Sequence, residues 1–385
     1  MQRIVWSEAA AGERRKALAR PDLRADATMR WRVTEMLDAV CDRGWEAVCD
    51  LATRIDASAP RLIAVAPAAA QARRSLGAEA VEAIELAADN IRVFHEASRP
   101  SDLAVETMPG LTVRKVWRAI PRVGLYVPGG ETPLFSSLLM QALPARAAGV
   151  KDLTVVTPPR KDGGLDPALA LAAELSGIEA VWTIGGAQAI AALAFGAGKI
   201  AACDKICGPG NAWVAEAKAQ VAARGVAIDL PAGPSELMVI ADAGAEARVV
   251  AADLLSQAEH DPTSQSILIT DSEALARQVE DAIDLALMKL PTAKTAKASW
   301  EAHGLIVVVD DLAEAPALSD RLAAEHVELM VDEPQPLFDA MRHAGSVFMG
   351  RHTPEAVGDY IAGPNHVLPP GRRARFASGL SVLDF

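Results

Sequence analysis

The sequence lacks the features by which membrane-spanning, secreted and disulfide-rich proteins are recognised. Hydrophobic residues make up 51% of the chain, but no apolar run approaches the roughly 20 residues that a membrane-spanning helix needs. The N-terminus has no basic segment followed by an apolar stretch, so we expect no secretory signal. The four cysteines do not form a disulfide framework for a chain of 385 residues, and we interpret them as reduced thiols of a cytoplasmic protein. Cys203 and Cys207 have the spacing of a metal-binding pair, but no second pair accompanies them.

Basic residues are scarce relative to acidic ones. The formal net charge is −12, which argues against nucleic acid as a partner because phosphate binding requires a basic surface. No repeat of roughly 20–50 residues and no low-complexity linker is visible. The length of 385 residues suits two or more domains with ample cores.

Alternating strand and helix patterns predict an α/β fold with parallel sheets. Residues 8 to about 100 have apolar positions at helical spacing, so we expect helices there. After Arg122, short apolar strands alternate with helices, which is typical of parallel sheets with right-handed crossovers. The expected strands are 123–127, 152–157, 180–184, 237–241, 266–270 and 304–309. The expected helices between them are 167–176, 187–195, 212–223, 245–255 and 272–290.

We expect these elements to form three regions. Residues 1–118 are an N-terminal helical region that packs with the second α/β unit, residues 119–234 are the first α/β unit, and residues 235–385 are the second. The segment Pro231-Ala232-Gly233-Pro234 marks the expected join, because proline and glycine interrupt regular structure.

Polar residues that are able to bind a metal follow one of the expected helices. Gln257 and His260 are three residues apart, so their side chains project from one face of a helical turn and could hold a metal. Three further candidates follow: the acid–base pair Glu325-His326, Asp359 in a Gly-Asp-Tyr turn, and His366. Taken singly, these residues are also typical of an amphipathic helix, a solvated helix end and a turn. Their order along the chain favours a metal-assisted enzyme.

Two glycine-rich turns are candidates for cofactor binding. Gly185-Gly186-Ala187-Gln188 lies between an expected strand and an expected helix, where free N–H groups and the helix dipole favour a phosphate. The usual G-x-G-x-x-G fingerprint is absent, so close helix–strand packing is an alternative explanation. Gly208-Pro209-Gly210-Asn211 has the same form, and Tyr126 ends a strand beside Pro128-Gly129-Gly130. Tyr126 is equally consistent with cofactor contact and with core packing.

Six longer motifs carry a resemblance to a known family. They are residues 122–130, 185–196, 204–211, 232–236, 253–260 and 358–369. On these motifs the chain, from about residue 20 to Phe385, closely resembles the histidinol dehydrogenases. The resemblance implies a zinc enzyme that uses NAD twice to oxidise L-histidinol, a small amino alcohol, to L-histidine in the last step of histidine biosynthesis. It also implies a homodimer and an α/β fold of two incomplete Rossmann-like units with N-terminal helices.

Carried over by motif, the resemblance implies a role for each candidate residue. The implied zinc ligands are Gln257, His260 and Asp359. The residues implied to lie near NAD are Tyr126, Gln188 and Asn211. The implied acid–base residues are Glu325 and His326. The implied substrate contacts are Ser235, Gln257, His260, His326, Asp359 and His366.

Two departures separate the sequence from the family pattern. Family members continue past the motif that ends here at Phe385 into a short helical tail, which gives a zinc-ligand His and a substrate-contacting Glu to the neighbouring subunit. In addition, residue 324 is Ala where the family usually carries Pro. The first departure leaves three alternatives open: a truncated sequence, a metal site that water or substrate completes, or a paralogue. Such a paralogue would oxidise another small polar alcohol, for example a sulfonated or hydroxy-acid alcohol, or would be catalytically silent.

Overall fold

The structure, a computed structural model, describes residues 1–19, 27–129, 134–230 and 233–385. These residues belong to two compact units, and each unit draws on several stretches of the chain. Unit 1 contains Met1–Arg24, Gly233–Gly358 and Leu368–Gly379. Unit 2 contains Ala25–Ala232, Asp359–Val367 and Leu380–Phe385. Pro231 and Ala232 of the expected join lie outside the described residues.

Unit 1 is built on a six-stranded parallel sheet with the strand order β1-β12-β11-β10-β13-β14. The strands are β1 (Gln2–Val5), β10 (Glu236–Ala241), β11 (Gln265–Thr270), β12 (Leu305–Val308), β13 (His326–Met330) and β14 (Ser346–Met349). The four central strands are buried along their whole length, as expected for a parallel sheet that is covered on both faces. From β10 onwards the strands follow the 3-2-1-4-5 order of a Rossmann-like sheet.

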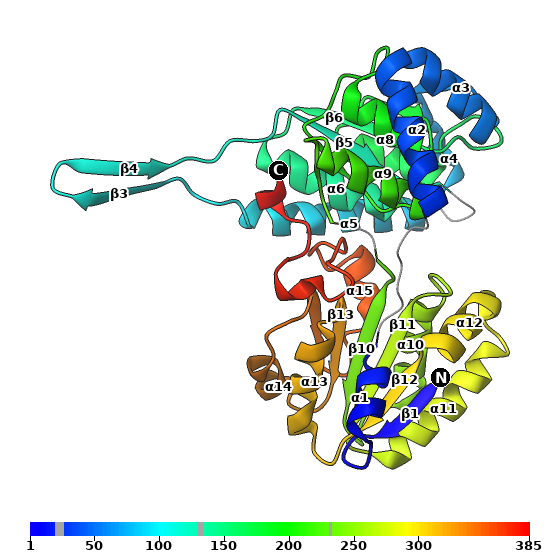
Figure 1. The fold of residues 1–385 in the computed structure, drawn as a ribbon, viewed down its shortest axis with the longest axis vertical. Helices are drawn as coiled ribbons and strands as arrows, with labels where there is room; N and C mark the ends of the chain where they lie inside the picture. Colours follow the sequence, from blue (N-terminus) through cyan, green and yellow to red (C-terminus); the bar gives the residue numbers. More distant parts are fainter. Residues whose placement is uncertain (20–26, 130–133, 231–232) are drawn as a thin grey trace. The chain divides into compact units, whose positions relative to one another are not determined.

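Helices cover both faces of this sheet (Figure 1). One core cluster joins alternate strand residues to α10, α11 and α12, and a second cluster joins the intervening residues to α1 and α13. The helices are α1 (Ala11–Ala17), α10 (Ala247–Ala258), α11 (Glu273–Leu287), α12 (Ala293–His303), α13 (Ala315–Leu322), α14 (Pro334–Ala340) and α15 (Glu355–Tyr360). Short 3-10 helices are η1 (Leu312–Glu314) and η2 (Arg373–Arg375). The alternation of the two clusters along each strand follows from the period of two in a β-strand.

Unit 2 contains a second six-stranded sheet, with the order β2-β7-β6-β5-β8-β9. Its strands are β2 (Arg61–Ala64), β5 (Arg122–Tyr126), β6 (Asp152–Thr157), β7 (Ala180–Thr183), β8 (Lys205–Cys207) and β9 (Ala227–Ile228). Only the edge strand β2 runs antiparallel, and the remaining five repeat the 3-2-1-4-5 order. The predicted α/β class with Rossmann-like parallel sheets is confirmed by the two sheets.

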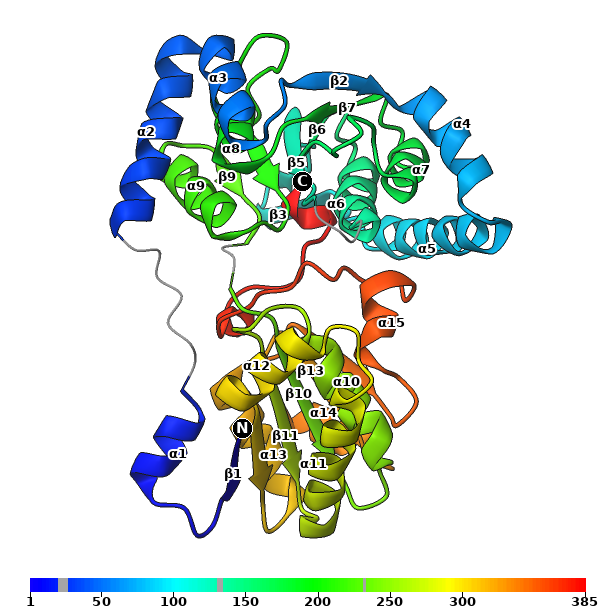
Figure 2. The same cartoon turned by 90° about the vertical axis from the view of Figure 1, so that its right-hand side faces the viewer.

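The N-terminal helices pack in unit 2, which corrects one expectation. Only β1 and α1 join the second α/β unit; α2 and α3 pack on α8 and α9, and α4 and α5 pack on α7 and α6 (Figure 2). The helices of unit 2 are α2 (Ala27–Arg43), α3 (Trp45–Ile55), α4 (Val65–Ser75), α5 (Ala78–Ala97), α6 (Phe135–Ala148), α7 (Pro167–Leu175), α8 (Gly186–Phe195), α9 (Ala212–Ala223) and the 3-10 helix η3 (Val382–Asp384). The apolar stripe Val33, Leu37 and Val40 of α2 is buried against α8 and α9, whose own surfaces are apolar. An apolar stripe indicates which face of a helix is buried, but it does not identify the helices or strands that pack against that face.

A two-stranded hairpin, β3 (Leu103–Met108) and β4 (Leu111–Lys115), stands apart from the other elements of unit 2 (Figure 1). Every residue of both strands is exposed. The sequence patterns did not predict this hairpin. Among the described residues, none of the helices combines the length and the apolar character that spanning a lipid bilayer requires.

Candidate active site

The Glu325-His326 pair lies at the start of the buried strand β13, at the amino-terminal edge of the sheet in unit 1. His326 is 5% exposed and Glu325 is 8% exposed, so this acid–base pair is not the end of a solvated helix. Ala323, two residues before Glu325, has a left-handed backbone with φ 46°. Such a conformation is strained for a residue with a Cβ atom and is often found beside functional residues.

One residue of the neighbouring strand orients both members of the pair. The backbone N–H of Glu236 donates to Glu325 Oε2 at 3.3 Å, and the backbone carbonyl of Glu236 lies 3.2 Å from His326 Nδ1. Because a carbonyl oxygen only accepts, Nδ1 must carry the proton in this contact. The neutral imidazole therefore keeps its basic lone pair on Nε2.

His326 Nε2 faces a carboxylate from helix α15. The distance from Nε2 to Glu355 Oε1 is 3.6 Å, and Glu355 is 2% exposed. The ring of Phe348 stacks against the imidazole at a centroid distance of 6.2 Å. A buried carboxylate beside Nε2 stabilises the imidazolium that forms when this nitrogen takes up a proton.

Helix α15 also carries Asp359, four residues after Glu355 and on the same helix face. Ligand-type atoms of His326, Glu355 and Asp359 all lie within 4.8 Å of one another. Because Glu355 and Asp359 belong to the same short helix, the geometry of that helix sets the distance between their side chains. The prediction of a Gly-Asp-Tyr turn at this position is wrong, because the segment is the end of α15.

A second carboxylate pair anchors the start of α15. Glu328 Oε1 accepts from the backbone N–H of Glu355 at 2.6 Å. The carboxyl of Glu328 also contacts that of Asp253 on α10, and both are buried. Burial and the neighbouring Asp253 raise the pKa of Glu328, and burial raises the pKa of Asp253. Two contacting carboxyls that are this deeply buried hold a proton at neutral pH.

The predicted ligands Gln257 and His260 lie together at the end of α10. Gln257 is fully buried, and its Nε2 lies 3.1 Å from Nδ1 of the exposed His260. Gln257 Oε1 is buried and has no hydrogen-bond partner among the described residues. The adjacent Ser256 donates to Glu355 Oε2 at 3.3 Å, so the end of α10 lies against the first turn of α15.

The donor atoms of these residues are of types that bind zinc. They do not form a single set of ligands. Imidazole nitrogens and carboxylate oxygens are usual zinc ligands, and the orphaned amide oxygen of Gln257 is a further oxygen donor. The compact group of His326, Glu355 and Asp359 shares only Asp359 with the predicted set of Gln257, His260 and Asp359. The predicted ligand set remains a prediction.

The remaining predicted substrate contacts lie on either side of these elements in the chain. Ser235 is half-buried just before β10, and its carbonyl accepts from the N–H of Gln265 at 3.0 Å. His366 belongs to unit 2, where its Nδ1 lies 2.9 Å from the carbonyl oxygen of Asp359. Because that oxygen only accepts, His366 Nδ1 donates and Nε2 is left as the basic nitrogen.

The predicted cofactor residues gather at the carboxyl ends of the strands in unit 2. Tyr126 ends β5, and its hydroxyl accepts from the backbone N–H of Gly186 at 3.3 Å. Burial raises the pKa of Tyr126 to about 12, so its phenol stays protonated. Gln188 Nε2 donates to Asp56 Oδ2 at 3.1 Å, and the same oxygen accepts from the N–H of Gly185 at 3.1 Å. Ligands of Rossmann-like sheets bind at this edge, where the strand order reverses between β5 and β8.

The second glycine turn meets the same edge at the end of β8. Gly208 has φ 125°, and a Cβ atom there would lie 2.0 Å from the carbonyl oxygen of Tyr126, so only glycine fits. Its N–H donates to Asp229 Oδ2 at 2.7 Å, and its carbonyl accepts from Lys218 Nζ at 2.7 Å. Asn211 caps α9 through its Oδ1, which accepts from two backbone N–H groups. The exposed amide group of Asn211 therefore remains able to donate to a ligand.

Sequence reasoning missed three carboxylates, Asp56, Glu328 and Glu355. Glu355 had one usable signal, its spacing of four residues before Asp359. Asp56 and Glu328 had none, because long-range packing alone brings them to their partners. Among the described residues, the group of three possible metal ligands consists of His326, Glu355 and Asp359. Cys203 and Cys207 do not belong to it.

Comparison with known proteins agrees with the resemblance seen in the motifs. The family model described as histidinol dehydrogenase matches residues 18–385. The chain is 54% identical to the histidinol dehydrogenase of Zymomonas mobilis over 311 residues, which are 81% of this chain and 72% of that protein. It is 46% identical to that of Xanthomonas campestris, covering 100% of this chain and 90% of that protein. The crystal structure of histidinol dehydrogenase from Elizabethkingia anophelis superposes with a TM-score of 0.95 at 36% identity, covering 100% of this chain and 88% of that chain.

Proposed function

The chain belongs to the histidinol dehydrogenase family, and we propose that it oxidises L-histidinol to L-histidine with NAD, completing histidine biosynthesis. One molecule of histidinol and one of water would reduce two molecules of NAD, because converting an alcohol to a carboxylate removes four electrons. The observation that carries this proposal is the buried His326, oriented by Glu236 so that its basic Nε2 faces Glu355.

His326 is the proposed base for the first oxidation. Its Nε2 takes the alcohol proton as hydride leaves the same carbon, and Glu355 stabilises the resulting imidazolium. The hydrogen bond from Nδ1 to the carbonyl of Glu236 keeps the ring in the correct tautomer. Proton transfer of this type contributes roughly 10²–10⁴-fold to a rate.

Glu325 is the proposed base for the second oxidation. The aldehyde must be hydrated before it can give up a second hydride, so a water molecule must lose a proton near its carbonyl carbon. Glu325 is buried beside His326 and held by the N–H of Glu236, so its orientation is fixed. Between them the two residues accept the proton of the water and the proton of the hydrate.

We propose that zinc is held by Gln257, His260 and Asp359. The orphaned Oε1 of Gln257 and the carboxylate of Asp359 supply oxygen donors, and His260 supplies nitrogen. When bound, zinc would supply Lewis acidity that makes the alcohol more acidic. The contact between Ser256 and Glu355 supports the proposal, because it brings the end of α10 to the helix that carries Asp359.

NAD is the proposed hydride acceptor, bound at the carboxyl edge of the sheet in unit 2. The N–H groups at the start of α8 favour a phosphate, although Gly185 N–H is already engaged by Asp56. Asp56 accepts from Gln188 there, Tyr126 accepts from the N–H of Gly186, and Asn211 offers an amide donor. Gln188 Oε1 is buried without a partner among the described residues, so it can accept a ribose hydroxyl.

We propose that the protein works as a homodimer in which the hairpin β3–β4 contacts a second copy. A two-stranded hairpin is marginally stable alone in water. Its exposed apolar side chains include Leu103 at 54%, Met108 at 59% and Val113 at 53% exposure. Burial of these side chains against a second copy would remove this apolar surface from water.

We propose the cytoplasm as the location of the protein. All four cysteines are free thiols. Two of them, Cys203 and Cys207, are buried and lie only four positions apart in the sequence. Burial raises the pKa of Cys203 to about 12 and also raises that of Cys207, so both stay protonated and unreactive. Buried free thiols suit a reducing compartment.

Two variants test the proposed roles. His326→Ala should keep its zinc but lose roughly 10²–10⁴-fold in the rate of NADH production. His260→Ala should lose zinc and activity together, because affinity depends on the number of ligands. His352→Ala, which changes an exposed histidine of unit 1, is the matched control. A near-normal rate for His326→Ala would move the role of the base to another residue, and full zinc content in His260→Ala would remove His260 from the ligand set.

A further inference from the structure

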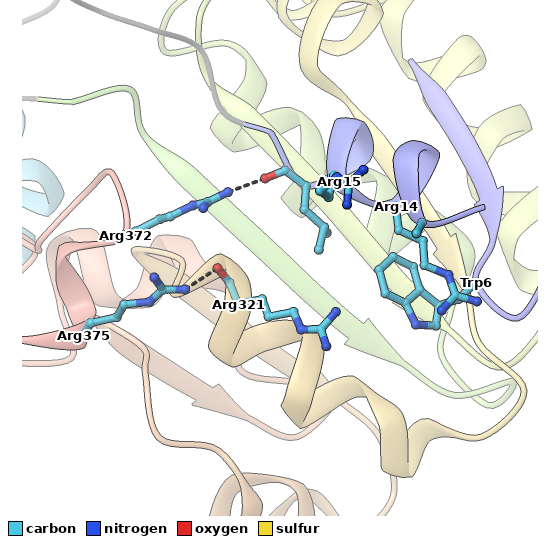
Figure 3. Close-up of a pocket in the computed structure, with 8 residues that line it drawn as sticks. Trp6, Arg14, Arg15, Arg321, Arg372 and Arg375 are labelled. Atoms are coloured by element: carbon cyan, nitrogen blue, oxygen red, sulfur yellow. Dashed lines mark hydrogen bonds between the residues drawn. The ribbon is translucent and has the colours of Figure 1, made fainter. Parts of the chain in front are cut away.

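Five arginines surround one pocket of unit 1, on residues that no proposed catalytic step uses (Figure 3). The pocket has a volume of about 450 Å³. Arg14 and Arg15 come from α1, Arg321 from the last turn of α13, and Arg372 and Arg375 from the segment around η2. This concentration of positive charge is notable in a chain whose formal net charge is −12.

Core packing fixes the walls of this arginine pocket. Ala17 and Leu18, at the end of α1, belong to the same buried cluster as Leu318 and Leu322 of α13. The two helices therefore hold their arginines on opposite sides of the pocket (Figure 3). Because this packing does not involve the arginine side chains, the core itself holds the backbone positions of Arg14, Arg15 and Arg321.

The hydrogen bonds of these arginines go to uncharged acceptors. Arg14 donates to the carbonyl of Ser7 at 3.2 Å, and its guanidinium lies 4.9 Å from the ring centroid of Trp6. Arg372 donates to the carbonyl of Leu18 (Figure 3). These contacts orient the guanidinium groups without neutralising their charge.

The same holds for the arginine nearest to α13. Arg375 donates to the carbonyl oxygens of Asp320 and Arg321, at 3.1 and 2.6 Å (Figure 3). The carboxylate of Asp320 is engaged elsewhere, because its Oδ1 accepts the backbone N–H groups of Arg342 and His343. Among the described residues, none of the five arginines forms an ion pair with a carboxylate.

Uncompensated charge of this density costs free energy. The Nε atoms of Arg14 and Arg372 are buried and have no hydrogen-bond acceptor among the described residues. Burial and the charge of Arg375 lower the pKa of Arg372. A bound anion would offset both the repulsion and the unmet hydrogen bonds.

We propose that the arginine pocket binds a small anion that carries two or three linked phosphoryl groups. Planar guanidinium groups match phosphoryl oxygens in pairs, and arginine is favoured wherever such bidentate recognition is needed. The volume lies in the range of roughly 300–1,000 Å³ that is usual for small-molecule sites. A nucleoside triphosphate and inorganic tripolyphosphate share this chemistry, and one experiment separates them.

The test is calorimetric titration of the full chain with ATP, tripolyphosphate and adenosine, in buffer without NAD, because NAD itself carries two linked phosphoryl groups. Binding at the proposed cofactor site would be the same in variants that change only unit 1, so comparison of two such variants separates the two sites. The test variant is Arg15→Glu/Arg321→Glu, because both side chains are exposed and make no hydrogen bond or ion pair among the described residues. The matched control is Arg248→Glu/Lys294→Glu, which changes the same net charge at exposed positions elsewhere in unit 1.

We expect saturable binding of tripolyphosphate and ATP by the native chain and by the control. The test variant should bind at least roughly tenfold more weakly, since each lost charge-assisted hydrogen bond is worth about that factor. Equal affinity for the two probes would assign recognition to phosphate alone, whereas tighter ATP binding with weak adenosine binding would add recognition of the nucleoside. The proposal is overturned if neither anion binds at millimolar concentration, or if the test variant and the control bind equally. Circular dichroism and melting temperature establish that both variants are folded.

Discussion

Replacement of the buried histidine His95 by phenylalanine should remove a pH-dependent part of the stability of unit 2. His95 lies in the last turn of α5, is 1% exposed, and has no hydrogen-bond partner for either ring nitrogen among the described residues. Its ring packs edge-on against Phe94 at a centroid distance of 5.3 Å. Burial lowers the pKa of His95 from 6.5 to about 4. A helix C-terminus favours the imidazolium, but here the loss of hydration outweighs it.

The sign and size of the effect follow from this shift in pKa. Between pH 6.5 and about 4 the unfolded chain binds the proton and the folded chain does not, so the free energy of unfolding falls as the pH is lowered. The contribution of His95 is fully present above pH 6.5 and is lost on acidification through that window. A difference of about 2.5 pKa units between the folded and unfolded chain contributes roughly 3 kcal/mol to the free energy of unfolding. About 2 kcal/mol of this contribution is lost when the pH is lowered to about 5.

Urea denaturation at about pH 7.5 and about pH 5, followed by tryptophan fluorescence, measures this loss. Of the seven tryptophans, only Trp6 and Trp300 lie in unit 1, so the signal reports mainly on unit 2. The difference in unfolding free energy between the two pH values should be smaller in His95→Phe than in the native chain by about 2 kcal/mol. His352→Phe, at an exposed position, should retain the native difference. Identical pH dependence in His95→Phe and the native chain would falsify the assignment.

Three further changes have expected outcomes. Glu355→Gln should lower kcat by roughly 10–100-fold in steady-state assays, because the imidazolium of His326 loses a charged partner at 3.6 Å; an unchanged kcat would contradict this role. Gly208→Ala should lower the free energy of unfolding by roughly 2 kcal/mol or more and weaken NAD binding, since the new Cβ atom would meet the carbonyl of Tyr126; native stability and affinity in denaturation and titration would refute the argument. Treatment with a chelator should abolish NADH production until zinc is restored, and activity that survives complete removal of metal would exclude a catalytic zinc.

The sequence predicted six of the twelve strands described in the two sheets, namely β5, β6, β7, β10, β11 and β12, which are short apolar runs. It missed the shorter or outer strands β1, β2, β8, β9 and β14, and also β13. The strand expected at 152–157 is β6, and the helix expected at 212–223 is α9, both with the same bounds. Both elements combine a clear boundary signal with an apolar run or helical periodicity. The hairpin β3–β4 was missed because both of its strands are exposed along their whole length, so no buried face imposes a strand pattern on their residues.

The packing of the N-terminal helices was predicted wrongly for a physical reason. Their stripes of apolar residues indicate burial, but helices of either unit would satisfy that requirement. The choice depends on side-chain volumes across the contact, such as the small residues Ala187 and Ala191 of α8 in the core cluster that also contains Leu37 of α2. Such complementarity is a property of two surfaces, and a single sequence presents them far apart.

The site was partly accessible from the sequence. The sequence singled out Glu325, His326 and Asp359 as candidates, because carboxylates and imidazoles are the side chains that carry acid–base and metal chemistry, and their roles stay predictions. The structure adds what the motifs do not contain, namely that Glu236 fixes the tautomer of His326 and that Glu355 faces its basic nitrogen. These two partners lie 90 and 29 positions away in the chain, and only the fold brings them together.

The stoichiometry of NADH tests the central claim most directly. Purified protein that is supplied with zinc, excess NAD and a limiting amount of L-histidinol should produce two molecules of NADH for each histidinol consumed, with histidine as the product. No NADH in the presence of bound zinc, or a single NADH with accumulation of a free aldehyde, would contradict the proposed four-electron oxidation.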